Sequence, residues 1–228
     1  MLFRGDFHIH SCLSPCASLE MSPAAIVKQA QESGLNALAL TDHNCTFNLP
    51  VFAEVCAREG MACLYGIEVN VLEEAHVLGL FDCLDSALEL GKLVYESLPD
   101  VPNQAGILGD QPIVNGKDEI LGFAEKTLYG ASSLSLHSLL EEVHHLGGLC
   151  IPAHIARPTN GIISQLGFIP DEDFDAVELR SGDNPELAGR YPVLRNSDSH
   201  FLESIGAVYN ELEMESLSVE NLMAALSL

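Results

Sequence analysis

Histidines and carboxylates of the kinds that bind metals recur at the ends of the short apolar segments of this sequence. His8 and His10 flank a single isoleucine near one end of the chain, and Asp198 and His200 flank a single serine near the other. In an extended segment residues i and i+2 point to the same side, so each pair can offer both side chains to one cation. The two pairs therefore predict a metal site that the fold assembles from distant parts of the chain.

Further residues of these types follow or precede other apolar segments, namely Asp42, His43, Glu68, His76 and His154. One pair alone could be surface or core histidines, or a helix cap. Six of the nine histidines lie in such positions, however, and this argues against an incidental origin for the whole set. Imidazole mixed with carboxylate suits zinc, manganese or iron better than calcium or magnesium. We expect no functional role for the three histidines of the helical stretch 135–146.

Strand-like and helix-like patterns alternate along the chain, as in an α/β protein. Strands are expected at residues 2–7, 35–40, 62–67, 77–81, 149–152, 176–179, 193–196 and 207–211. Helices are expected at residues 24–33, 51–58, 84–98 and 135–146, and from residue 219. The alternation predicts a parallel sheet, and the absence of a glycine-rich phosphate loop favours a barrel of roughly seven strands over an open sheet. In such a barrel the candidate ligands would meet at the C-terminal strand ends, although His76 begins its strand.

The length of the chain favours a single domain over residues 1–228. Residues 111–123 read as a β-hairpin with Asn115 and Gly116 as a two-residue turn. We expect this hairpin to be an insertion within residues 100–130.

The charge balance is strongly acidic, with 10 Lys and Arg against 33 Asp and Glu and a formal net charge of −23. No basic run offers a surface for a phosphate backbone, so we expect a small phosphorylated substrate and no long nucleic acid. Bound cations would supply the positive centre that such a substrate needs. Seven cysteines without a CxxC pair, no signal peptide and no long apolar run predict a cytoplasmic protein without a membrane segment. The oligomeric state stays open.

Six short segments, taken in order, resemble the motifs of the PHP (polymerase and histidinol phosphatase) family. They are residues 6–11, 40–44, 66–69, 75–79, 151–154 and 197–200. The resemblance implies an α/β fold, a distorted (β/α)7 TIM-like barrel with two to three divalent cations. It implies one cation at His8, His10, Glu68 and Asp198, with Glu68 bridging to a second cation at His76 and His154, and a third cation at His43 and His200. Asp42 would orient its neighbours.

The sequence departs from the family pattern after the His8–His10 pair. The family usually has an Asp a few residues later that completes the third site, whereas residues 14–20 here read Ser-Pro-Cys-Ala-Ser-Leu-Glu. We expect Glu20 to replace that Asp from a shifted position. Cys16 is a second candidate, with a free structural thiol as the favoured interpretation of this cysteine.

The function that these residues favour is a metal-dependent phosphoesterase acting on a small phosphorylated metabolite or nucleotide. A hydroxide shared between two cations would attack phosphorus, and no Ser or Cys triad is needed. Arg157, three residues after His154, is expected to hold the substrate phosphate. Arg180 and Arg195 are weaker candidates for this role.

Two alternatives to phosphoester hydrolysis remain open from the sequence. The chain could hydrolyse C–N or C–O bonds with the same metals, because related metal-bearing barrels host several chemistries. It could also be a metal-stabilised accessory protein without turnover, as the resemblance to polymerase-associated PHP domains implies.

Overall fold

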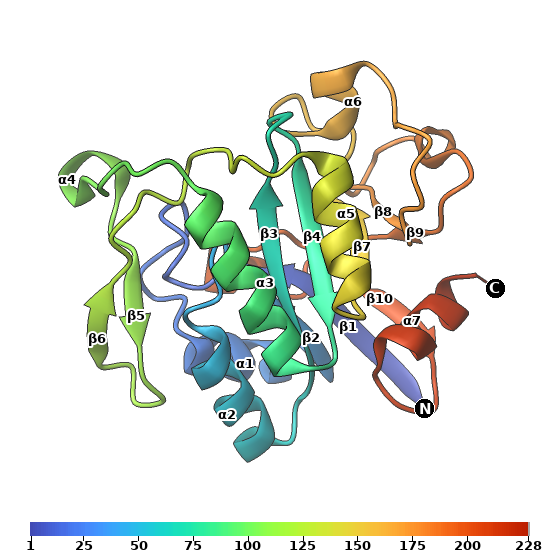
Figure 1. The fold of residues 1–228 in the computed structure, drawn as a ribbon. Coiled ribbons are helices and arrows are strands. Elements are labelled where there is room, and N and C mark those ends of the chain that lie inside the picture. The colour runs from blue at the N-terminus through green and yellow to red at the C-terminus, as the bar shows by residue number, and fades with distance from the viewer. Residues whose placement is uncertain (228) are drawn as a thin grey trace.

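The computed structural model describes residues 1–227 and folds them around one curled sheet (Figure 1). The strands are β1 (Leu2–Ile9), β2 (Ala37–Leu40), β3 (Ala62–Asn70), β4 (His76–Phe81), β5 (Pro112–Val114), β6 (Ile120–Phe123), β7 (Leu149–Pro152), β8 (Val177–Glu178), β9 (Val193–Leu194) and β10 (Asn210–Glu213). The helices are α1 (Pro23–Glu32), α2 (Leu49–Glu59), α3 (Leu84–Ser97), α4 (Ala105–Leu108), α5 (Leu136–His145), α6 (Ile162–Leu166) and α7 (Val219–Leu226), with short 3-10 helices η1 (Pro185–Ala188) and η2 (Leu202–Ser204).

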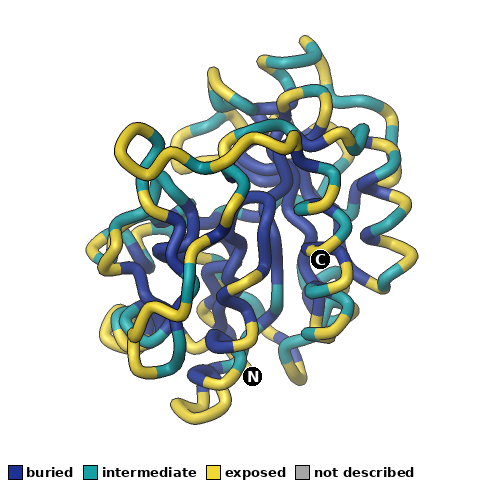
Figure 2. The backbone as a smooth tube through the Cα atoms, turned by 60° about the vertical axis from the view of Figure 1, so that its left-hand side comes forward, coloured by how far each residue is buried: buried dark blue, intermediate teal, exposed yellow. Residues whose placement is uncertain are grey.

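The main sheet has the strand order β10-β1-β2-β3-β4-β7. Strands β1, β2 and β3 are parallel, as the alternation of elements predicts, whereas β4 is antiparallel to both of its neighbours. The buried backbone of this sheet runs through the centre of the molecule, and exposed segments surround it (Figure 2).

Strands β8 and β9 continue the curl until the chain returns to β1. The backbone N–H of Ile155, just after β7, donates to the carbonyl oxygen of Glu178 in β8 at 3.0 Å. Ser199, after β9, forms a parallel bridge with Ile9, and the N–H of His10 donates to the Ser199 carbonyl at 3.0 Å. This arrangement confirms the distorted TIM-like barrel, with the short strands β8 and β9 as its irregular side.

The reversal of β4 follows from the length of its connection to β3. Residues 71–75 join the two strands in a tight turn, in which the N–H of Val71 donates to the Ala75 carbonyl at 3.0 Å. A parallel crossover needs about a dozen residues or more. The connection between β3 and β4 is too short for one, so the two strands must pair antiparallel. Asn70 at the end of β3 therefore pairs with His76 at the start of β4. This is why His76 lies at the same rim as groups that follow the parallel strands.

Two apolar layers hold the barrel in this shape. Phe7, Leu64 and Leu78 belong to the layer that also contacts the C-terminal helix α7. Residues such as Phe52 in α2 and Leu139 in α5 pack in the layer between the helices and the sheet. Both layers exclude solvent, so the strand ends are fixed by packing rather than by the polar groups they carry.

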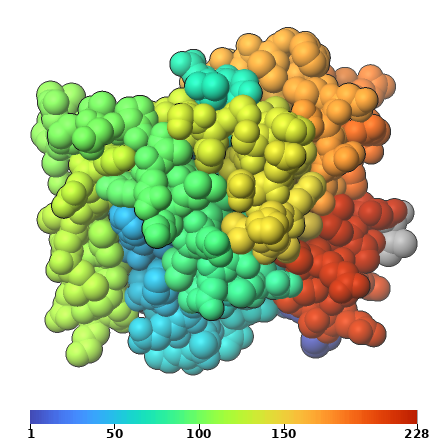
Figure 3. Space-filling model, viewed as in Figure 1, coloured from blue at the N-terminus to red at the C-terminus, as the bar shows by residue number. Residues whose placement is uncertain are grey.

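The hairpin differs from its prediction in the length of its turn. Strands β5 and β6 form, but the loop between them spans residues 115–119 instead of two residues, closed by the Asn115 N–H donating to the Glu119 carbonyl at 3.0 Å. The Asn115 side-chain oxygen also accepts from the N–H groups of Lys117 and Glu119, at 2.9 and 3.1 Å, which stabilises the wider loop. Residues near 100–125 form one side of the molecular surface (Figure 3).

The C-terminal strand β10 begins later than predicted and pairs antiparallel with β1.

The longest helix among residues 1–227 is α3, with 14 residues. A bilayer span needs about 20 apolar residues. Within the described chain, none of the helices combines the length and the apolar character that a membrane span requires.

Candidate metal centre

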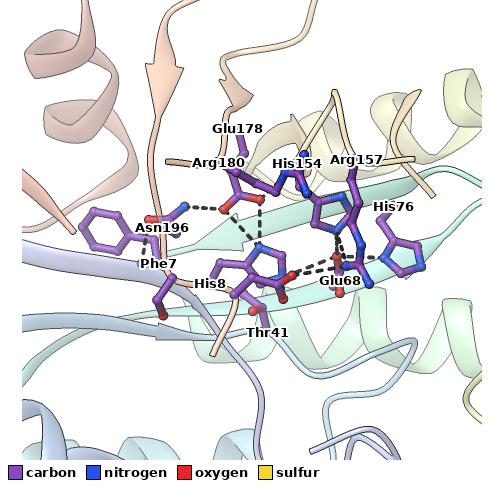
Figure 4. Close-up of polar contacts among 12 residues, drawn as sticks. Phe7, His8, Thr41, Glu68, His76, His154, Arg157, Glu178, Arg180 and Asn196 are labelled. Atoms are coloured by element: carbon purple, nitrogen blue, oxygen red, sulfur yellow. Dashed lines mark hydrogen bonds and ion pairs between the residues drawn. The ribbon is translucent and has the colours of Figure 1, made fainter. Parts of the chain in front are cut away.

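The structure gathers the predicted ligands other than Glu20 at one rim of the barrel. Glu68 in β3, His76 at the start of β4 and His154 after β7 converge there with the residues at the end of β1 (Figure 4). The side chains that lie together in this way are His8, His10, His43, Glu68, His76, His154, Asp198 and His200. Barrel strands that end at a common rim bring residues together whatever their separation in sequence.

Glu68 is the centre of the cluster and is fully buried. Its Oε1 lies 2.9 Å from His76 Nδ1 and 3.0 Å from His154 Nε2. Its Oε2 lies 2.9 Å from His43 Nδ1. Burial alone would raise the pKa of Glu68, but the surrounding imidazoles hold it well below its ordinary value. A carboxylate with ligand-type groups around both oxygens is suited to bridge two cations.

Three overlapping groups have potential ligand atoms within 4.8 Å of one another. They are His8, His10, Glu68 and Asp198; His43, Glu68 and His76; and His10, His43 and His200. Glu68 belongs to the first two groups and His10 to the first and third. This overlap fits neighbouring cations that share ligands.

Two buried polar atoms of the cluster lack a hydrogen-bond partner among the described residues. Glu68 Oε2 is close to His43 but is not aligned for a hydrogen bond, and His154 Nδ1 has no hydrogen-bond partner within the described residues. Burying such an atom without a partner costs about 1–3 kcal/mol. A divalent cation would satisfy the Glu68 oxygen directly, so the donor set fits the metal that its residue types predict.

Glu178 is a site residue that the sequence analysis missed. Its carboxylate accepts from His8 Nδ1 at 2.9 and 3.1 Å, and its Oε2 also accepts from the backbone N–H of His154 at 2.9 Å. The Asn196 amide donates to its Oε1 at 2.9 Å (Figure 4). Glu178 is buried, and a carboxylate inside an apolar strand was the one signal that could have identified it.

Asp42 lies behind the cluster and contacts two serines instead of ligand atoms. Its Oδ1 accepts from the Ser11 N–H and the Ser14 hydroxyl, both at 2.7 Å, and its Oδ2 accepts from the Ser11 hydroxyl at 2.6 Å. The Ser14 oxygen in turn lies 3.1 Å from His10 Nδ1. Because the Ser14 hydroxyl donates its hydrogen to Asp42, the Ser14 oxygen can accept a hydrogen bond from His10 Nδ1–H. The other nitrogen of His10, Nε2, then carries the lone pair and faces the cluster.

Arg157 reaches the edge of the cluster from the loop after β7. Its Nη1 lies 3.3 Å from Asp198 Oδ2 and 3.4 Å from His154 Nε2. The guanidinium lines a cavity of about 160 Å³ together with His43, His76 and His200. The two weaker candidates lie outside this cavity: Arg180 pairs with Asp183, and Arg195 donates to a backbone carbonyl.

Glu20, which was expected to be a ligand, is not brought to the cluster in this structure. The residue is exposed, and its backbone N–H donates to the Ser18 hydroxyl at 3.3 Å in a turn that faces solvent. Cys16 lies at the rim instead, where it lines the same cavity as His43 and His200. Burial would raise the pKa of the Cys16 thiol, but hydrogen bonds with His200 and His43 lower it to about 7.

Two residues of the cluster adopt left-handed backbone conformations, which residues other than glycine rarely adopt. His154 has φ 31° and Asp198 has φ 51°. Left-handed conformations of non-glycine residues persist where surrounding contacts enforce them and cluster at functional sites. Here the Glu178 carboxylate holds the His154 backbone, and the bridge from Ser199 to Ile9 holds the segment after Asp198.

Comparison with known proteins identifies relatives along most of the chain. A family model described as "PHP domain" matches residues 6–164, and one described as "PHP-associated" matches residues 190–228. YqxK of Bacillus subtilis, which is uncharacterised, is 38% identical over 101 residues, covering 39% of this chain and 26% of YqxK. A 3',5'-nucleoside bisphosphate phosphatase of Chromobacterium violaceum is 37% identical over 90 residues, covering 38% of this chain and 30% of the phosphatase. The chain thus spans about a quarter to a third of the length of these relatives.

A solved structure with the same fold contains DNA. Endonuclease Q in complex with a 27-mer duplex carrying an abasic lesion at its active site superposes with a TM-score of 0.76 at 20% identity. The superposition covers 100% of this chain and 57% of the endonuclease chain. The likeness at this identity concerns the fold.

The expectation of a small phosphorylated substrate alone, with long nucleic acid excluded, is therefore wrong. It relied on the net charge of −23, but the fold of this chain is one that accommodates a DNA duplex in endonuclease Q. Net charge describes the whole surface, whereas cations and nearby cationic groups set the potential at a site.

Three findings agree on the family of this chain: the motifs of the sequence, the barrel with its cluster, and a family model that matches well over half of the residues. The chain belongs to the PHP domain family.

Proposed function

We propose that the chain hydrolyses phosphoester bonds of nucleotides, either free or within a polynucleotide, with divalent cations held at the rim cluster. The observation that carries the proposal is the position of Glu68, whose two oxygens face His43 and His76. Arg157 lines the same cavity as these two imidazoles. Such a site combines ligands for neighbouring cations with a cationic group for a phosphate oxygen.

Each group at the rim has a distinct role in this proposal. His8, His10, Glu68 and Asp198 hold one cation, and Glu68, His76 and His154 hold a second. Zinc, manganese and iron fit this donor set. When bound, the cations supply Lewis acidity and lower the pKa of water at the site. Arg157 binds a non-bridging phosphate oxygen, and Asp42 and Glu178 keep the imidazoles oriented through their hydrogen bonds.

The size of the cavity supports a substrate that is only partly enclosed. Its volume is about 160 Å³, whereas pockets that enclose a whole small ligand measure roughly 300–1,000 Å³. The phosphate and part of its sugar can enter, and the rest of the molecule must lie outside. A nucleotide unit of a longer strand meets this condition as well as a free nucleotide does.

An activity panel on one metal-analysed sample tests the proposal. The substrates are a nucleoside 3',5'-bisphosphate, a single-stranded oligonucleotide, a duplex with an abasic site, and an amide and a lactone, each with added Mn²⁺ or Zn²⁺. We expect phosphoester cleavage that requires metal and is lost in Asp198→Asn. Turnover of the amide or lactone alone would instead indicate C–N or C–O hydrolysis, and metal binding without any turnover would indicate an accessory protein.

A further inference from the structure

The loop that carries Tyr129 is held on both sides of this residue by one side chain. Asn44 Nδ2 donates to the backbone carbonyl of Leu128 at 2.9 Å and to that of Gly130 at 3.0 Å. Asn44 is fully buried, so solvent does not compete for these two hydrogen bonds. The backbone on either side of Tyr129 is therefore fixed to Asn44.

Asn44 is in turn fixed to strand β3, which carries Glu68. Its Oδ1 accepts from the backbone N–H of Asn70 at 2.8 Å, and its own backbone N–H donates to the Glu68 carbonyl at 2.8 Å. Asn44 has φ 51°, a left-handed conformation that persists in residues other than glycine where surrounding contacts enforce it. These contacts set the position of the Tyr129 loop relative to the metal-type residues of the rim.

Two further contacts hold the same loop. Leu128 is buried in an apolar cluster, and its N–H donates to Gln111 Oε1 at 2.9 Å. The N–H of Ser132 donates to the backbone carbonyl of Asn70 at 2.8 Å. A loop with this many buried attachments presents Tyr129 in a defined place, which lowers the entropy that a ligand must remove on binding.

The Tyr129 ring is accessible at the edge of the rim cavity. The residue is 47% exposed and lines the cavity together with Arg157. Tyr95 and Tyr191 differ, because each packs its ring against a phenylalanine and hydrogen bonds its hydroxyl to backbone groups. Those two rings stabilise the fold, whereas the ring of Tyr129 is available to a ligand.

The side chain of Asn70 is an independent sign that the cavity receives a polar ligand. Asn70 lines the cavity and is only 7% exposed, yet its Oδ1 has no hydrogen-bond partner among the described residues. An unpaired buried amide oxygen costs free energy, which a donor group on a ligand can offset. Sugar hydroxyls and base amino groups are donors of this kind, and a bare phosphate has none at neutral pH to match them.

We propose that Tyr129 stacks against the base of the nucleotide whose phosphate Arg157 binds, and that Asn44 is the residue that positions Tyr129. The inference rests on the proposed function, which places the phosphate at the rim. A cavity of about 160 Å³ leaves the base outside, next to the exposed ring. Every base has a face that can stack on an aromatic ring, so this contact selects nucleotides over phosphate esters without a base and does not read sequence.

Two matched probes measure the contribution of the base without turnover. They are the methylene-phosphonate analogues of adenosine 5'-monophosphate and of ribose 5-phosphate, which resist hydrolysis and differ only in the base. Loss of an aromatic platform typically weakens base binding by about 5- to 150-fold. We therefore expect the zinc-loaded protein to bind the adenosine probe more tightly than the ribose probe by a factor in this range. Isothermal titration calorimetry gives both dissociation constants.

Substitutions of Tyr129 test which part of the side chain acts. Tyr129→Ala should bring the ratio of the two dissociation constants close to one, and Tyr129→Leu should lower it strongly because leucine has no aromatic face. Tyr129→Phe should keep the ratio, since stacking needs the ring and not the hydroxyl. Tyr209→Ala is the matched control, because Tyr209 is exposed but is not among the residues that line the cavity. A ratio near one in the parent, or an unchanged ratio in Tyr129→Ala, would overturn the assignment.

Proton NMR reports the stacking itself. An aromatic ring shifts protons that lie over its face to lower frequency, so the adenine H2 and H8 signals of the bound adenosine probe should move in this direction. We expect the shift with the zinc-loaded parent and with Tyr129→Phe, and its loss with Tyr129→Leu. A shift of equal size with Tyr129→Leu would mean that another group holds the base.

The Asn44→Ser variant tests the positioning role. Serine lacks the amide that binds both carbonyls beside Tyr129, so the ratio of dissociation constants should fall while circular dichroism and bound zinc stay at the parental values. Loss of zinc together with equal weakening of both probes would assign Asn44 to the metal site and refute its positioning role. Phosphoester cleavage by a parent with a ratio near one would refute the stacking alone. A ratio above about fivefold without any cleavage would refute the proposed hydrolysis alone.

Discussion

His8 Nδ1 lies between the two carboxylate oxygens of Glu178, at 2.9 and 3.1 Å, although the residues are 170 positions apart in sequence. The contact is fully buried on the histidine side. Burial alone would lower the pKa of His8, but Glu178, Glu68 and Asp198 raise it well above its ordinary value. Because the carboxylate binds the Nδ1–H, the other ring nitrogen of His8 is directed toward Glu68 and Asp198.

The Glu178→Gln variant tests this positioning role. Loss of the carboxylate weakens the orientation and basicity of His8, and partners of this kind typically change metal affinity roughly 10- to 100-fold. We expect a fall of that order in metal affinity, measured by competition with a chelating dye. The matched control is Glu172→Gln, which removes a similar contact of 3.1 Å to the exposed His137 and should leave affinity unchanged. Equal affinities of parent and Glu178→Gln would argue against the role.

Asp198→Asn and His154→Ala should abolish phosphoester hydrolysis while the fold is kept. Both side chains belong to the rim rather than to the apolar layers, so their loss removes ligands and not apolar packing. Circular dichroism and metal analysis should accompany the rates. Near-parental turnover in either variant would show that the reaction occurs elsewhere.

Arg157→Ala should raise KM for a phosphate ester without an equal loss of metal. A charge-assisted hydrogen bond contributes roughly 1.5–3 kcal/mol, which corresponds to about a tenfold change in KM or more. Arg157 also contacts Asp198 at 3.3 Å, so metal content must be measured in parallel. Arg180→Ala, an exposed arginine paired with Asp183, is the control. A KM within about twofold of the parent would remove Arg157 from the substrate site.

Removal of the cations should destabilise the folded chain. Cations that bind only the native state add RT ln(1 + [L]/Kd) to its stability, about 2.7 kcal/mol at a concentration of 100 Kd. We expect at least two equivalents of transition metal in protein prepared without chelator, and a lower Tm after chelation that added Zn²⁺ restores. Less than one equivalent in gently prepared protein would count against the whole cluster.

Stability should fall in alkaline solution because several thiols are buried. Burial raises the pKa of Cys12 to about 12 and also raises the pKa values of Cys45 and Cys150. Unfolded thiols ionise near pH 8.5, so the unfolded state loses protons first and the free energy of unfolding declines as pH rises above that value. The limiting slope is about 1.4 kcal/mol per pH unit for each such thiol.

Urea unfolding at a series of pH values measures this slope. Cys45→Ala should flatten it by the share of one thiol, whereas Cys83→Ser, at an exposed position, should not flatten it. A stability independent of pH between 8 and 10 would contradict the burial of these groups.

The sequence by itself determined the types of group at the rim and the elements that carry them. Apolar strands that end in histidine or carboxylate can place those side chains only where the apolar core stops, so the position of Glu68 and of the His8–His10 pair followed from pattern alone. His76 lies at the start of its strand because the short connection from β3 makes β4 run antiparallel. The start of β4 therefore lies at the same rim as the end of β3.

Tertiary structure decided the partners of those groups. In the sequence, Glu178 is one residue of a short predicted strand and nothing marks it as a site residue. The curl of the sheet brings β8 close to the end of β1, so that the Glu178 carboxylate contacts His8. Whether Glu20 or Cys16 lies at the rim depended on two hydrogen bonds that fix the direction of the loop: the His43 N–H donates to the Ser14 hydroxyl oxygen, and the Ser18 N–H donates to the His200 carbonyl. Such contacts join residues that are distant in sequence, and their geometry follows from packing of the whole barrel rather than from any local pattern.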